Sequence, residues 1–452
     1  MMIPNSIKRM TLPIEYICFL MCLCYWFFYS LVRTKGVPVY FSGFQIHSTL
    51  AAILASVVLL FNSLFFSRLF LELALRISSF RANLIRFLFK NIIPVSIVLL
   101  LIAFATGGRF DYASYKLQWH NILEGQDPWG FVEGGMVNAY GYVFNFLSTL
   151  YSIHSLLPKF FFVLLLLLFC WRLILTQPRE IQGLVFFLCI NPFTISTVAI
   201  YGFSDGLCSL LLGFALLERS QESLRSSFIS GVMLSLSILS KFYSIVALPI
   251  LIQTYLNSRL FKSFMKGLSS TSIAVLILSY LFWGNSIFTP LLFAQSRDPS
   301  FLTLWKYVPH PELRTVVFLV VSVFGVAIAL TRKDISPSLR TASILSIVFG
   351  TYYLGHQQFY LGILIALIVY IAEASKVGGL GLGAPTLWSF ALMLGWLIFV
   401  QTGFELFDEF KPIGFQTILP FFSFLNSTIL VASGLFWLSI KPSRVKRTLT
   451  IS

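Results

Sequence analysis

Long apolar runs and short polar segments alternate along the whole chain. The apolar runs come near the roughly 20 residues that a helix needs to cross a bilayer. Backbone groups in lipid must be hydrogen-bonded within their own segment, so each run is predicted to be a helix. The runs are continuous and do not alternate residue by residue, which argues against a membrane barrel. The pattern predicts an all-α, polytopic membrane protein with about 12–14 spans.

The polar segments between the predicted spans fall into two classes of charge. If the N-terminus is cytoplasmic, alternate segments carry roughly two thirds of the Lys and Arg residues, as the positive-inside rule requires. The other segments collect most of the acids, together with Lys241, His310 and His356. We therefore expect any active site on the non-cytoplasmic face.

Composition supports a membrane protein and excludes several other classes. The chain is 57% hydrophobic and only 11% charged, with a mean hydropathy of +0.86, whereas soluble domains carry about a quarter charged residues. The net charge of +15 does not indicate nucleic-acid binding, because the basic residues are spread over short loops. All six cysteines lie in apolar runs without the spacing of a metal site or a disulfide framework.

The first long non-cytoplasmic segment contains GRFDYASYKLQWHNILEGQDPWG, residues 108–130. Its periodicity predicts a helix over 111–123 that lies in the membrane interface, with aromatic residues on one face and charged residues on the other. Gly125 is predicted to end this helix, and Asp127-Pro128 to form a turn. Asp111 stands at the helix start, where a carboxylate is either an ordinary cap or a functional group.

Three further polar groups lie between or within apolar runs. Asp205 in YGFSDG is either a turn residue or a functional acid. Lys241 in LSILSKFYS either extends to the interface or serves a function, because a lysine within lipid is costly. His356-Gln357-Gln358 is either a plain polar turn or a set of donors. A carboxylate base, a cation and amide donors suit sugar transfer from a phosphate-linked donor, although a transporter would also gather charges on one face.

Residues 108–130 resemble the first luminal loop of the catalytic subunit of GPI mannosyltransferase I, a glycosyltransferase family of the GT-C type. The matching residues there are Asp111, Tyr112, Glu124, Gly125, Pro128 and Trp129. Similar blocks follow in the family's order, and the resemblance covers about residues 100–375. These blocks contain Tyr140 and Tyr142; Asn191, Pro192, Gly202 and Asp205; Gly231, Lys241, Tyr243 and Pro249; and His356, Gln358 and Phe359.

The resemblance implies inverting transfer of a hexose from a dolichyl- or polyprenyl-phosphate donor, with Asp111 as the general base or as the acid that positions the acceptor. The chain departs from the family at three places. Arg109 replaces the first acid of the family's acidic pair, Tyr201-Gly202-Phe203 replaces Arg-Gly-Asn, and Ser244 replaces a proline. The change at Arg109 argues against a two-carboxylate metal site. A relative that acts on another sugar or acceptor is therefore expected.

We predict a membrane glycosyltransferase, with mannose as the first candidate sugar and Asp111 as the catalytic residue. The predicted partners are a polyprenyl-phosphate-linked sugar donor, a lipid or glycan acceptor, and membrane lipids. No cofactor is assigned; a divalent cation stays open but is disfavoured by Arg109. The predicted substrate-binding residues are Arg109, Tyr112, Lys116, His120, Tyr140, Tyr142, Asp205, Lys241, Tyr243, His356, Gln357 and Gln358.

The predicted organisation is a two-span extension (1–90), a GT-C-like catalytic core (91–375), and C-terminal spans with a basic cytoplasmic tail (376–452). The membrane is the plasma membrane in a prokaryote or the endoplasmic reticulum in a eukaryote. The alternatives are a lipid-linked-sugar transporter or flippase, a polymerase or ligase of lipid-linked glycans, and a structural membrane protein. A transporter should show an internal repeat, and the sequence contains none that we can detect. A ligase should concentrate basic and His residues on one large loop.

Overall fold

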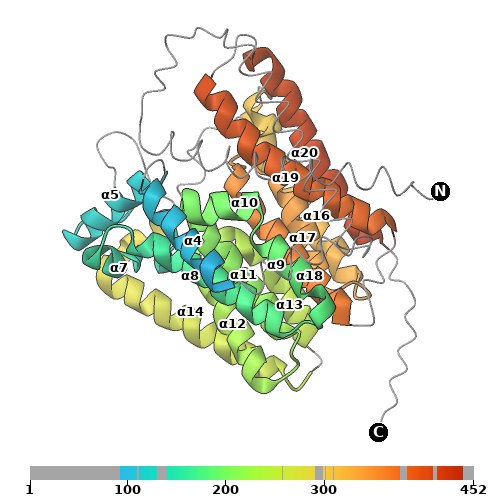
Figure 1. Ribbon diagram of the computed structural model, residues 1–452, viewed down its shortest axis with the longest axis horizontal. Helices are drawn as coiled ribbons and strands as arrows, with labels where there is room; N and C mark the ends of the chain where they lie inside the picture. The colour runs from blue at the N-terminus through green and yellow to red at the C-terminus, as the bar shows by residue number, and fades with distance from the viewer. Residues whose placement is uncertain are drawn as a thin grey trace.

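The computed structural model describes residues 92–108, 111–129, 140–256, 258–290, 299–300, 302–308, 310–376, 384–410 and 415–440. Every regular element in these ranges is a helix, as Figure 1 shows, so the predicted all-α class is confirmed for this part of the chain. The predicted N-terminal extension, Arg109 and the basic tail lie outside the described residues.

The described helices follow one another along the chain, most of them with short connections. They are α4 (Ile92–Thr106), α5 (Asp111–Leu123), α6 (Tyr142–Asn145), α7 (Ser148–Ile153), α8 (Leu157–Leu175), α9 (Arg179–Cys189), α10 (Pro192–Ile195), the π-helix η1 (Ser196–Ile200), α11 (Ser204–Arg219), α12 (Leu224–Ser240), η2 (Phe242–Ala247), α13 (Leu248–Tyr255), α14 (Phe261–Trp283), η3 (Gly284–Phe288), η5 (Leu304–Lys306), α16 (Pro311–Thr331), α17 (Pro337–Thr351), η6 (Gln357–Tyr360), α18 (Leu361–Lys376), α19 (Ala384–Phe410) and α20 (Phe415–Ser439).

Five of the described helices are long and apolar enough to cross a membrane, or up to seven if two bent helix pairs each count as one span. The chain therefore has the helices of a multi-pass membrane protein. The predicted total of 12–14 covers the whole chain, including the two-span extension outside the described residues; within those residues several apolar helices, such as α12 and the η2–α13 segment, are shorter than a full span. Ser and Asn caps and prolines set some of these boundaries: Ser336 Oγ accepts the amide of Leu339 at 3.2 Å, directly before Pro337.

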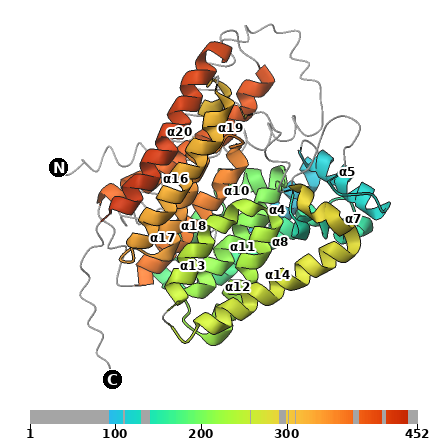
Figure 2. The ribbon, with the colours of Figure 1, turned by 180° about the vertical axis from the view of Figure 1, so that it is seen from behind.

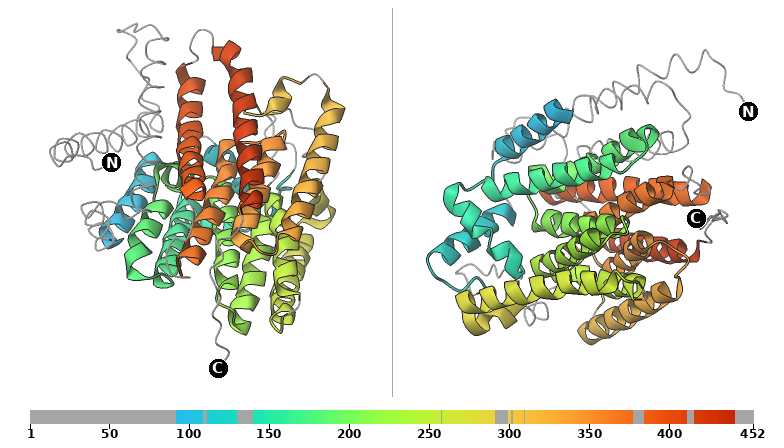
Figure 3. Two further views of the ribbon diagram at one scale, coloured as in Figure 1. Left: turned by 90° about the vertical axis from the view of Figure 1, so that its right-hand side faces the viewer. Right: turned by 90° about the horizontal axis from the view of Figure 1, so that it is seen from below.

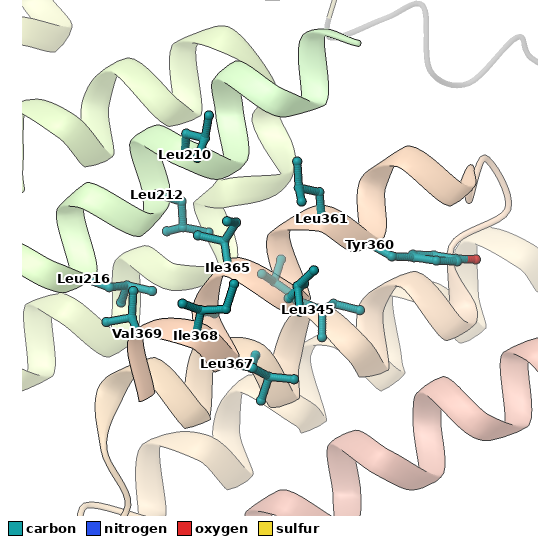
Figure 4. Packing of buried hydrophobic residues seen from close by; sticks show 14 of the residues in the cluster. Leu210, Leu212, Leu216, Leu345, Tyr360, Leu361, Ile365, Leu367, Ile368 and Val369 are labelled. Atoms are coloured by element: carbon teal, nitrogen blue, oxygen red, sulfur yellow. The ribbon is translucent and has the colours of Figure 1, made fainter. Parts of the chain in front are cut away.

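The centre of the bundle is formed by α11, α17 and α18, which are buried on nearly all sides. Figure 4 shows their apolar side chains packed together, with leucines of α11 against Ile365, Ile368 and Val369 of α18. Buried polar side chains find backbone partners within the bundle: Ser230 of α12 donates to a carbonyl oxygen of α11, and Ser346 of α17 donates to a carbonyl oxygen of α20. By contrast, α14 and α16 expose many large apolar side chains, and Figure 2 shows α14 along the outside of the bundle beside α12. Such faces suit contact with lipid.

Polar contacts define two ends of the bundle. At one end, which we call the acidic end, hydrogen bonds connect the starts of α5, α8 and α11 with the end of α12, the end of η1 and η6. The opposite end holds the Arg172–Glu218 ion pair at 2.8 Å and the bond from Arg340 to Gln253 at 2.6 Å. Among the described residues, Asp111, Asp205, Lys241 and Gln358 thus lie at one end of the bundle, and Arg172 and Arg340 lie at the other. Figure 3 shows α19 and α20 extending beyond the rest of the bundle.

Candidate functional site

The helix α5 carries Asp111 as its first residue and ends at Leu123, as the sequence predicts. Its aromatic face is fully buried, with the rings of Tyr115 and Trp119 each 5.0 Å from the ring of Phe144 in α6. This face therefore packs against protein, because α6 and α7 cover it. The helix stays beside the bundle through these aromatic contacts, and its placement in the membrane interface remains a prediction.

The predicted stop of α5 is confirmed. Gly125 has a positive φ of 77°, which favours glycine. The following turn is closed by Asp127, whose Oδ1 accepts the amide of Trp129 at 2.9 Å and whose Oδ2 accepts the hydroxyl of Ser286 at 2.5 Å. The turn thus ties the end of α5 to the segment that follows α14.

Asp205 and Lys241 form a buried ion pair at the acidic end. The Lys241 ammonium donates to both Asp205 oxygens at 2.9 Å. The Asp205 side chain is 0% exposed and that of Lys241 is 16% exposed, so the lysine is the member of the pair that water or a ligand can reach. This pairing fits neither a plain turn aspartate nor a lysine that extends to the interface, and the functional alternatives for both residues stay predictions.

The backbone at Lys241 breaks the path between α12 and η2. Its φ of −160° and ψ of 123° are extended, and its amide still donates to Ser237 O at 3.1 Å. The Cys208 thiol of α11 lies 3.4 Å from the Lys241 carbonyl oxygen and 3.0 Å from the Ser244 hydroxyl. These contacts fix the backbone of Lys241. The break in the helix at this residue therefore positions its ammonium beside Asp205.

The backbone of the loop before α6 lies in direct contact with the backbone at the end of α12, next to this break. The Gly141 amide donates to Ser240 O at 3.0 Å. A Cβ on Gly141 would lie 2.2 Å from Leu239 O, so only glycine fits at this position. The close approach brings the ring of Tyr140 to 5.5 Å from the Lys241 ammonium, a cation–π distance.

The segment around η6 supplies the remaining groups of the site. Gln358 Nε2 donates to Asp111 Oδ2 at 3.3 Å. The neighbouring ring of Phe359 lies 4.1 Å from the Lys241 ammonium, and the His356 ring is 5.5 Å from the Phe359 ring. One short segment therefore links Asp111 on one side to Lys241 on the other.

Tyr115 of α5 contacts the start of α11 next to the site. Its hydroxyl lies 3.4 Å from Ser204 Oγ and accepts the Ser204 amide at 3.3 Å, at the start of α11. This contact joins the buried face of α5 to the start of α11, one residue before Asp205.

The structure thus brings together six of the predicted site residues, namely Asp111, Tyr140, Asp205, Lys241, His356 and Gln358. We call these six residues the site cluster.

The other predicted residues have different surroundings. Tyr112 donates to Ser155 O at 3.0 Å, Tyr142 donates to Ile287 O at 2.8 Å, and the Tyr243 hydroxyl lies 3.0 Å from Ser209 Oγ. Each of the three hydroxyl groups thus has a partner within the protein, and burial raises the pKa of Tyr142. His120 pairs with Glu124 at 3.0 Å on the exposed side of α5, Lys116 is partly exposed on α5, and Gln357 is buried in η6.

Sequence reasoning missed two residues at the acidic end. Gly141 lies inside the Tyr140–Tyr142 block, but nothing local signals the close backbone contact. Lys159 is fully buried and donates to Thr106 Oγ1 at 2.7 Å, Gly107 O at 2.7 Å and Ile200 O at 2.6 Å. In the sequence LPKFFF a lysine at the edge of an apolar run looks like an ordinary interface residue.

The site cluster offers a partly exposed carboxylate, a lysine held beside aromatic rings, and amide and imidazole groups. The described residues contain no cluster of three His, Cys, Asp or Glu side chains that could hold a metal ion. Such a set can accept a proton from a hydroxyl and stabilise a developing phosphate charge. Searches with the whole chain against protein-family models and curated proteins give no match.

Proposed function

We propose that this chain is a membrane glycosyltransferase of the GT-C type, which moves a hexose from a polyprenyl-phosphate donor to a lipid or glycan acceptor. The observation that carries the proposal is the contact between Gln358 and Asp111 at 3.3 Å, next to the contact of Phe359 with Lys241. It joins the proposed base to the proposed phosphate partner through neighbouring residues. The two groups could have lain at opposite ends of the bundle, which would have contradicted the proposal.

The reaction assigns one role to each charged group. The acceptor oxygen attacks C1 of the hexose, while the bond from C1 to the phosphate oxygen breaks. Asp111 takes the proton of the acceptor hydroxyl. The electron pair of the broken bond stays on the phosphate, whose growing negative charge the Lys241 ammonium offsets. The products are the inverted glycoside and the free polyprenyl phosphate.

Asp205 keeps Lys241 in place for this role. An ammonium has three N–H donors, and Asp205 takes two bonds at 2.9 Å. One donor is therefore left for a phosphate on the 16% exposed side of the lysine. Gln358 orients the carboxylate of Asp111 in the same way, because its amide fixes one of the two carboxylate oxygens.

The test is incubation of the purified protein with a panel of polyprenyl-phosphate sugars in lipid vesicles. A transferase releases free polyprenyl phosphate with at least one donor and forms a new glycoside with a matched acceptor. A flippase moves the intact donor across the bilayer and releases nothing, and a glycan polymerase or ligase consumes a diphosphate-linked glycan instead. Either of these two outcomes would replace the proposal.

A further inference from the structure

The buried cation of Lys159 lies outside the site cluster. Its three hydrogen bonds go to neutral oxygens of Thr106, Gly107 and Ile200, which use all three N–H donors of the ammonium. Within the part of the chain that the structure describes, its amine shows no ion pair with a carboxylate. Burying a charge without a paired acid is costly, so the three bonds must offset that cost.

The three acceptors are not scattered. Thr106 ends α4 and Gly107 follows it, directly before the segment that leads to Asp111. Ile200 ends the π-helix η1, directly before the segment that leads to Asp205. A cation at the C-terminal end of a helix is stabilised by the helix dipole. The Lys159 ammonium therefore joins the two chain segments that lead to Asp111 and Asp205.

The aliphatic stem and the backbone amide of Lys159 also contact α5 and the segment between η1 and α11. The Lys159 amide donates to Tyr112 Oη at 3.2 Å. Gly202, with a φ of 62°, lies so close that an added Cβ would be 2.9 Å from Lys159 Cγ and 3.1 Å from Tyr112 Cδ2. The segment between η1 and α11 is thus pressed against the lysine stem and the first turn of α5.

We propose that Lys159 is a positioning residue that sets the placement of Asp111 relative to the rest of the site cluster. The inference rests on the proposed function for its effect on catalysis, but its geometric content stands apart from any activity. Loss of the ammonium frees the end of α4 from the end of η1. Asp111 then moves relative to Gln358, while the Asp205–Lys241 pair keeps its own contacts.

A matched control exists at the opposite end of the bundle. Arg340 is also a buried cation, and it donates to Gln253 Oε1 at 2.6 Å, Ala329 O at 3.3 Å and Thr254 Oγ1 at 3.3 Å. It fastens the ends of α13 and α16 as Lys159 fastens those of α4 and η1. Arg340→Met should therefore lower the thermal stability in a similar way without touching the acidic end.

The test measures the Asp111–Gln358 proximity directly. The pair of substitutions Asp111→Cys and Gln358→Cys is introduced into the full-length protein in membranes, and the rate of disulfide formation is followed by mass spectrometry of the cross-linked peptide. Adding Lys159→Met should slow this rate about tenfold, which corresponds to about 1.4 kcal/mol, whereas adding Arg340→Met should leave it unchanged. Equal rates in the presence and absence of Lys159, or equal slowing by both substitutions, would overturn the inference.

A milder variant covers the case in which Lys159→Met does not fold. Thr106→Val removes one acceptor and keeps the ammonium and its other two bonds, and it should slow the cross-link by a smaller factor. In the transfer assay, Lys159→Met should lower kcat more than it raises the donor KM, because Lys241 is left in place. If the wild-type protein shows no transfer, only the proposed function fails; the cross-linking result still decides the role of Lys159.

Discussion

The ion pair between Asp205 and Lys241 gives the sharpest quantitative prediction. Its two members differ in burial, because the Asp205 side chain is 0% exposed and that of Lys241 is 16% exposed. Lys241→Met leaves a carboxylate without its cation in the interior. Asp205→Asn leaves a lysine that still contacts the rings of Phe359 at 4.1 Å and Tyr140 at 5.5 Å. The two single substitutions should therefore have unequal costs.

The expected magnitudes follow from the loss of one partner of a buried pair. Lys241→Met should lower the free energy of unfolding by about 3–5 kcal/mol, the usual cost of an uncompensated buried charge. Asp205→Asn should cost only about 1–3 kcal/mol, the range for one polar group left unsatisfied. The double variant Asp205→Asn/Lys241→Met removes both charges, so it should be more stable than Lys241→Met alone.

The assay is reversible unfolding in mixed micelles with increasing SDS, followed by circular dichroism for the wild type and the three variants. The control is Asp334→Asn, which breaks the Arg332–Asp334 pair at 2.9 Å but leaves Arg332 its bonds to Leu438 O and Ile440 O. The Asp334 carboxylate is exposed and hydrated, so the loss of this pair should cost little stability. The reasoning fails if Lys241→Met lowers the free energy of unfolding no more than Asp205→Asn does, or if the double variant is the least stable. The ion pair would then not be desolvated, and its assigned role would be wrong.

Two other predictions concern the carboxylate and the backbone contact of the site. Asp111→Asn should reduce transfer by at least about 100-fold with an unchanged melting temperature, because an amide oxygen can still accept the Gln358 bond at 3.3 Å; normal turnover would remove Asp111 from the reaction. Gly141→Ala should cost about 1–3 kcal/mol of stability and raise the donor KM, because its Cβ would lie 2.2 Å from Leu239 O and would push Tyr140 away from Lys241. Gly325→Ala, with its nearest contact an ordinary 3.5 Å from Ile347, is the matched control and should be nearly neutral in a thermal-shift measurement; similar losses for the two variants would contradict the close-contact explanation.

Local features of the sequence predicted local features of the structure well. The bounds of α5 follow from an aromatic face with helical spacing and a glycine stop. These predictions succeed because neighbouring residues alone determine them.

Long-range pairings could not be obtained in this way. The contact between Asp205 and Lys241 depends on how α11 and α12 pack, and the buried position of Lys159 depends on where α4 and η1 end. A single sequence carries no local signal for either contact. Helix length also depends on packing, since an apolar run inside a bundle is satisfied by protein neighbours and need not reach across the bilayer, as the short apolar helix α12 illustrates.

The central claim is that Asp111 acts as the base of a sugar transfer from a lipid phosphate. The most direct measurement compares wild type and Asp111→Asn in the same vesicles, loaded with polyprenyl-phosphate mannose and acceptor, by the rate at which free polyprenyl phosphate and new glycoside appear together. The account predicts equal amounts of both products from the wild type and at least about 100-fold slower formation from the variant. Equal rates from the two proteins, or no product from the wild type with any hexose donor, would contradict it.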